Sequence, residues 1–256
     1  MTILTAVLSL LLLAPTVSDV PDVPTPDELP VHTEEVLVVG DGPLVAPVRP
    51  GEPVRVVFGA GELLVEPGDV AQVRAEVELR CPPKRRARCG DVHKKLRVKA
   101  EHTDDGVVVR VAGVRANILK RYDVSAHVVV PRSSPLVVKA GFGAVRVVAG
   151  DRSVSVDMKV GDLRVFGRRE VFSSASARAR IGDASVREGR EVHSRRSKLI
   201  GAKASWQETR SLVAARSGES KRREDGESIE IRLRIGDARV VLEDAAPRLS
   251  GIPGSD

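Results

Sequence analysis

Aromatic residues are scarce in this 256-residue sequence, where four Phe, one Tyr and one Trp make up 2% of the chain. Carbohydrate clefts and single-strand nucleic-acid platforms usually stack their ligands on exposed rings, so the composition argues against both classes. The sequence also lacks a Gly-x-Ser-x-Gly nucleophile elbow, a P-loop and a dinucleotide-binding fingerprint. We therefore expect a protein that is not an enzyme and that uses no cofactor and no metal.

Valine is abundant instead, with 43 residues, and 22 Gly and 16 Pro supply turns. Apolar and polar residues alternate strictly over residues 73–80 and 96–101, which is typical of strands with one buried face. Similar strands are predicted at 54–58, 107–111, 124–130 and 136–140. No segment shows a helical period with caps. The predicted fold class is all-β without long helices.

The second half of the chain contains a short repeat. The pattern Gly-x-apolar-x-Val begins at Gly143, Gly161, Gly182 and Gly236, and a weaker copy begins at Gly201. A period near 20 with a turn glycine and a short strand is typical of solenoid coils, which bury their apolar faces by stacking. The sequence thus predicts a single-chain β-solenoid or β-helix-like domain over 42–256, with a hairpin-rich part (42–135) and repeat coils (136–245).

Three of the repeat glycines precede an aspartate, at Asp162, Asp183 and Asp237. Glycine tolerates a positive φ where a coil bends, and Asp can accept hydrogen bonds from nearby backbone amides, so these residues are predicted to be structural turns. The alternative is a ladder of carboxylates that binds Ca²⁺. Calcium coils usually need two or more oxygen ligands per turn at a strict period, which this sequence does not offer.

The runs Val137–Val147, Gly161–Val165 and Gly182–Val186 resemble the bacterial putative-adhesin family of β-solenoid domains. The strand that ends at Val130-Pro131, just before the first repeat, also fits that pattern. The resemblance covers roughly residues 50–245 and implies a secreted or envelope-exposed, non-catalytic β-solenoid. The segment 205–227, which contains Trp206 and the charged run 221–225, departs from the pattern and is predicted to be an irregular coil or surface loop.

The N-terminus predicts export. Residues 1–18 have the apolar run and the small-residue site of a signal peptide, although no Lys or Arg precedes the run. Residues 19–41 form a predicted acidic, proline-rich linker with seven acids and no Lys or Arg. The remainder, 42–256, has 41 basic against 28 acidic residues, a formal charge of +13. We expect a periplasmic or secreted protein whose partners could be anionic envelope polymers, lipid headgroups or another envelope protein, and not specific nucleic acid.

The chain has two cysteines, Cys81 and Cys89, which are predicted to form a disulfide across the tip of a hairpin. A zinc site that adds His93 and His102 is the alternative, but the spacing matches no common finger. Between the cysteines lie four cations that a rigid loop would present together to phosphate or sulfate oxygens. These cations are Lys84, Arg85, Arg86 and Arg88.

Three functions stay open at this point. The first is an exported, non-catalytic structural or adhesin-like interaction module of the cell envelope. The second is a basic surface protein that binds anionic polymers or lipids through the Cys81–Cys89 hairpin. The third is a β-helical polysaccharide-active enzyme, which the lack of aromatics and of clustered acids disfavours.

Overall fold

A computed structural model describes residues 35–198, 200–207 and 226–244. The predicted signal peptide and the charged run 221–225 lie outside these residues. The elements are, in chain order, β1 (Glu35–Val38), β2 (Leu44–Pro47), β3 (Val54–Gly68), β4 (Gln72–Cys81), a 3₁₀ turn (Pro83–Arg85), α1 (Arg86–Lys95), β5 (Arg97–Thr103), β6 (Gly106–Ala112), α2 (Ala116–Leu119), β7 (Asp123–Pro131), β8 (Leu136–Val148), β9 (Val154–Arg168), β10 (Phe172–Glu188), β11 (Glu191–Lys198), β12 (Ala202–Gln207) and β13 (Glu227–Glu243).

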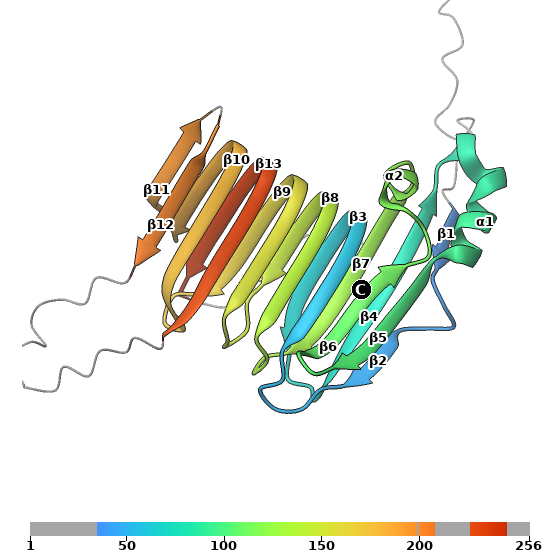
Figure 1. The fold of residues 1–256 in the computed structure, drawn as a ribbon, viewed down its shortest axis with the longest axis horizontal. Helices are drawn as coiled ribbons and strands as arrows, with labels where there is room; N and C mark the ends of the chain where they lie inside the picture. Colours follow the sequence, from blue (N-terminus) through green and yellow to red (C-terminus); the bar gives the residue numbers. More distant parts are fainter. Residues whose placement is uncertain (1–34, 199, 208–225, 245–256) are drawn as a thin grey trace, which may run out of the picture. The chain divides into compact units, whose positions relative to one another are not determined.

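The strands of the described residues form one large mixed sheet of 13 strands. Its centre is parallel, in the order β7-β3-β8-β9-β13-β10, whereas β4 at one end pairs antiparallel with β7, and β11 and β12 at the other end pair antiparallel with β10 (Figure 1). The helices are short, with ten residues in α1 and four in α2. The all-β class without long helices is confirmed. The sheet is not closed into a β-helix.

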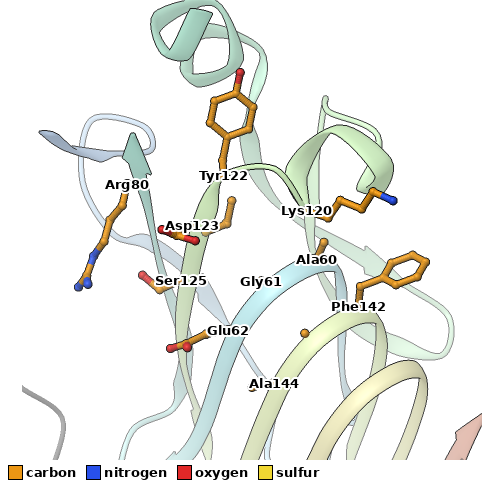
Figure 2. A pocket seen from close by; sticks show the side chains of 12 residues that line it. Ala60, Gly61, Glu62, Arg80, Lys120, Tyr122, Asp123, Ser125, Phe142 and Ala144 are labelled. Carbon is orange, nitrogen blue, oxygen red and sulfur yellow. The ribbon is translucent and has the colours of Figure 1, made fainter. Parts of the chain in front are cut away.

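Each long parallel strand folds back on itself. The first residues of β8 and β9 are partners, Leu136 with Val154, yet only residues 149–153 connect the two strands. Six Cα steps span at most about 22 Å, whereas a straight strand of 13 residues would be about 43 Å long. The strand must therefore arch so that its two ends come close, and Figure 2 shows such arches in β3 and β8 beside Gly61 and Phe142.

Five glycines in register form the bend of these arches, at Gly61, Gly143, Gly161, Gly236 and Gly182. Their φ angles lie between +118° and +138°. A Cβ on Gly161 would lie 1.8 Å from the carbonyl oxygen of Gly143, and one on Gly236 would lie 1.8 Å from that of Gly161. Only glycine fits this row, because any side chain would collide with the backbone of the next strand.

The core lies between the two halves of the arched strands. In β9 the side chains of Val156 and Met158 before the glycine, and of Leu163 and Val165 after it, are at most 1% exposed. Arg164 between the last two is part-exposed. The alternation in the sequence therefore predicted the buried face of this strand correctly.

The order of the repeats differs from the prediction. Coils stacked in chain order would place β10 beside β9, but β13 lies between them and is parallel to both (Figure 1). The weak copy at Gly201 is no member of the glycine row, because β12 runs antiparallel to β10 and pairs Ala202 with Ala179. Instead Gly61, from the part predicted to be hairpin-rich, begins the row.

Two predicted boundaries also change. β1 falls within the range assigned to the linker and pairs with β4, so the folded part begins at Glu35 at the latest. Trp206, predicted to lie in an irregular coil, is 9% exposed in β12. The rest of that segment up to residue 225 lies outside the described residues.

Candidate anion-binding surfaces

Cys81 and Cys89 form a disulfide, with their Cα atoms 5.9 Å apart. The segment between them is not a hairpin tip. It contains the 3₁₀ turn and the start of α1, and β5 pairs with β6 and not with β4. The reason is local: Lys-Arg-Arg-Ala-Arg is a run of strong helix formers, and Pro83 stands in the first turn, where a missing N–H costs nothing.

This helix spreads the four predicted anion-binding cations. Lys84, Arg85, Arg86 and Arg88 are all exposed. Successive residues of a helix point about 100° apart, so Arg86 and Arg88 project from nearly opposite sides. The guanidinium of Arg85 lies 6.0 Å from the centre of the Tyr122 ring, a cation–π contact that holds it against the sheet. The four charges do not converge on one point.

The metal alternatives find no support in the described residues. The disulfide occupies both cysteines, so the zinc alternative is wrong. His93 and His102 instead bond through Nε2 to the carbonyl oxygens of Val38 (2.8 Å) and Pro47 (3.1 Å), which joins β1 to α1 and the end of β2 to β5.

The aspartates after the turn glycines form one row along the sheet. Asp162 and Asp237 are register partners, and the amide of Asp183 donates to the Asp237 carboxylate at 3.4 Å. Asp162 pairs with Arg164 at 2.9 Å. No group of three potential metal ligands occurs in the part of the chain that the structure describes. The carboxylates of Asp162 and Asp237 bond to an arginine and to a backbone amide of the arches, contacts that structural turns can make.

A second basic surface was not predicted. It lies on the outer side of the first halves of β8, β9, β13 and β10 and continues onto β12. In these segments every second side chain is buried in the core, so the basic residues between them point outward. We call it the cationic face and define it by seven exposed residues: Lys139, Lys159, Arg178, Arg180, Lys203, Arg232 and Arg234. Asp157 and Glu230 are the acids among them. Since neighbouring strands lie about 4.8 Å apart, this surface spans about 19 Å from β8 to β12.

The charges of the cationic face are poorly neutralised. Arg232 pairs with Glu230 at 2.9 Å. Among residues 35–198, 200–207 and 226–244, the other six cations have no ion pair with a side chain of this chain. Arg178 is moreover the direct register partner of both Arg232 and Lys203. Like charges opposite each other destabilise a sheet, so this arrangement costs stability and favours an anion placed over it.

The position of β13 explains why the sequence did not reveal this face. The alternation already indicates that Arg232 and Arg234 point outward. Their place between Lys159 of β9 and Arg180 of β10 follows only from the insertion of β13. Without the strand order, the same residues are dispersed charges on separate repeats.

An open hollow of about 570 Å³ lies where α2 and β7 meet the arches of β3 and β8 (Figure 2). Its charged lining residues are Glu62, Arg80, Lys120 and Asp123, two carboxylates and two cations. Its charges balance, so the hollow has no electrostatic preference for an anion.

Comparisons with known proteins do not assign this chain to a family. No family model and no curated protein matches the sequence. Among solved structures, the chain is similar to a "putative cell adhesion protein" from Clostridium sporogenes, with a TM-score of 0.39 and 13% identity over 79% of this chain and 98% of that one. This likeness is too weak to show a family, so the resemblance to adhesins stays a prediction. Neither helix in the described part of the chain is long and apolar enough to cross a bilayer.

Proposed function

We propose that this protein is an exported, non-catalytic interaction module of the cell envelope that binds an extended anionic polymer across its cationic face. The observation that carries the proposal is the set of seven exposed cations over five adjacent strands, because six of these cations have no ion pair in the described residues. Their stack of arched strands acts as a solenoid-like scaffold. The cations stand on hydrogen-bonded strands of this scaffold, so they are presented with little ordering cost on binding.

An extended ligand suits this face better than a small one. The cations form rows across strands that are about 4.8 Å apart, and a flat sheet offers no enclosure for a small anion. A polymer with repeated phosphate, sulfate or carboxylate groups can contact several of them at once. Guanidinium groups such as those of Arg178, Arg180 and Arg234 can bind such oxygens bidentately.

Export rests on two features. The disulfide between Cys81 and Cys89 is of a kind that persists in oxidising compartments. The apolar run and small-residue site in residues 1–18 have the pattern of a signal peptide. In such a compartment the anionic polymers of the envelope are the partners that this surface meets.

The test compares two variants matched in charge. The face variant carries Lys159→Gln, Arg180→Gln and Arg234→Gln. The control carries Lys84→Gln, Arg85→Gln and Arg88→Gln, which also removes one Lys and two Arg but from the α1 segment. Both are eluted from an immobilised sulfated polysaccharide with a salt gradient, after circular dichroism has shown that they are folded.

The proposal expects the face variant to elute at clearly lower salt than the wild type and the control to elute close to the wild type. If the control shifts and the face variant does not, binding resides in the α1 segment and the predicted alternative site is correct. Equal shifts would mean that net charge alone determines retention, and the proposal would be wrong.

A further inference from the structure

A row of apolar side chains follows the bends of the arches. The residue before each turn glycine is apolar in all five arched strands, and these residues are register partners: Ala60, Phe142, Val160, Ile235 and Ile181. Phe142 is 37% exposed, Ile181 42% and Ile235 45%, whereas Val160 is part-exposed and Ala60 is buried. Single exposed apolar residues are ordinary, but a contiguous row marks an interaction surface. We call Phe142, Val160, Ile235 and Ile181 the apolar rim.

The two sides of the rim differ in charge. The chain folds back at each turn glycine, so the residue before the rim position and the residue after the glycine belong to opposite halves of the arch. On one side lie Lys159, Arg234 and Arg180 of the cationic face. On the other side lies the row of carboxylates that includes Asp162 and Asp237. Two residues further along these strands, Arg146, Arg164 and Arg239 are register partners and offset the carboxylates, and Arg164 pairs with Asp162. The rim is therefore an apolar edge with a strongly basic side and a side of mixed charge.

We propose that the apolar rim inserts into the headgroup region of an anionic lipid bilayer while the adjoining cations contact lipid phosphates. This inference rests on the proposed function and adds a membrane surface as a second anionic partner of the cationic face. Apolar side chains that enter the boundary between headgroups and acyl chains, together with basic residues beside them, are the two components of interfacial binding. The four residues of the rim and the cations next to them supply both on one edge of the sheet.

The charges also set the orientation of the bound protein. The basic side attracts lipid phosphates more strongly than the side of mixed charge does, so the sheet leans with its cationic face towards the bilayer. Ile200 extends the apolar surface at the far end. It is 73% exposed and precedes Gly201, whose amide donates to the carbonyl oxygen of Arg180 at 2.8 Å.

The experiment measures sedimentation of the full chain with vesicles of phosphatidylcholine that do or do not contain phosphatidylglycerol. The rim variant carries Phe142→Ser, Ile181→Ser and Ile235→Ser. Its matched control carries Val36→Ser, Val45→Ser and Val192→Ser, three residues that are 48%, 50% and 45% exposed and lie on β1, β2 and β11. Binding to soluble polyphosphate is measured in parallel for each protein, and circular dichroism shows that each is folded.

We expect the wild type to bind the phosphatidylglycerol vesicles and not those of phosphatidylcholine alone. The rim variant should lose at least about tenfold in partitioning onto these vesicles while its polyphosphate affinity stays unchanged. The control should match the wild type in both assays. The face variant Lys159→Gln, Arg180→Gln and Arg234→Gln should lose both activities.

A wild type that does not sediment with the anionic vesicles, or a rim variant that sediments like it, overturns the membrane proposal. So does a wild type that self-associates in analytical ultracentrifugation through an interface that the rim variant lacks, because the rim would then bind a second copy of the chain. A face variant that keeps its polyphosphate affinity instead refutes the proposed function. The two failures are thus distinguishable.

Discussion

Replacement of Gly161 by alanine should destabilise the arches strongly. The new Cβ would lie 1.8 Å from the carbonyl oxygen of Gly143 on the neighbouring strand, at a backbone φ of +138°. The strained conformation alone costs about 1–3 kcal/mol. To relieve the overlap β8 and β9 must separate locally, which weakens one or two backbone hydrogen bonds at about 1 kcal/mol each. We expect a loss of about 2–5 kcal/mol and a fall in Tm of roughly 10 °C.

Gly189→Ala is the matched control. Gly189 also has a positive φ, +55°, but an added Cβ there meets nothing within 4 Å. The substitution should cost only about 1–2 kcal/mol, which is the strain of a left-handed conformation. Urea unfolding followed by the fluorescence of Trp206, the single Trp in the sequence, measures both variants. Equal losses for the two would refute the claim that close approach of strands, and not φ alone, demands glycine in this row.

Three further perturbations test the core, the pH response and the disulfide. Val165→Asp places an unpaired charge in the core and should cost more than about 4 kcal/mol in the same assay. Arg164→Asp, on the exposed side of the strand, should cost less than about 1 kcal/mol. Equal losses of stability for the two variants would contradict the strand register. Burial raises the pKa of Glu227, but hydrogen bonds from the side chain and amide of Ser153 and from Arg152 outweigh it and lower that pKa overall. The stabilisation that Glu227 contributes is therefore complete above the ordinary carboxyl range and is lost as pH falls through the lowered pKa. Between about pH 6 and about pH 3 the wild type should lose more stability than Glu227→Gln does. Parallel curves of stability against pH for the two proteins would contradict this. Reduction of the disulfide should lower Tm by about 5–10 °C, for a contribution of about 2–3 kcal/mol, and an unchanged Tm would show that the bridge does not stabilise the fold.

The strand faces could be predicted from the sequence because a strand has a side-chain period of two. Leu163 and Val165 are buried and Arg164 is part-exposed, as alternation requires. The turn glycines could also be found, because they recur in the pattern Gly-x-apolar-x-Val. Gly61 was not predicted, although Gly-Ala-Gly-Glu-Leu-Leu-Val contains the same pattern as Gly-Phe-Gly-Ala-Val-Arg-Val around Gly143. The similarity of these two segments is the feature of the sequence that could have predicted Gly61 as a turn glycine.

The neighbour of each strand could not be predicted. The residues of β13 do not by themselves specify that it pairs with β9 and β10, because any strand with the same apolar period fits the same core. The cationic face depends on this pairing, so it was invisible in the sequence. The α1 segment escaped prediction for another reason. The spacing of Cys81 and Cys89 suits a hairpin tip, but the helix-forming residues between them determine the local structure.

The central claim, that the cationic face binds a polyanion, is tested most directly by the salt dependence of affinity. Fluorescence anisotropy of labelled polyphosphate gives the slope of log affinity against log salt for the wild type and for the face variant Lys159→Gln, Arg180→Gln and Arg234→Gln. If these three cations bind the polymer, the slope should fall in magnitude by about two, because each phosphate that a cation neutralises contributes about 0.7 for a single strand. A face variant with the slope and affinity of the wild type would show that the polymer binds elsewhere.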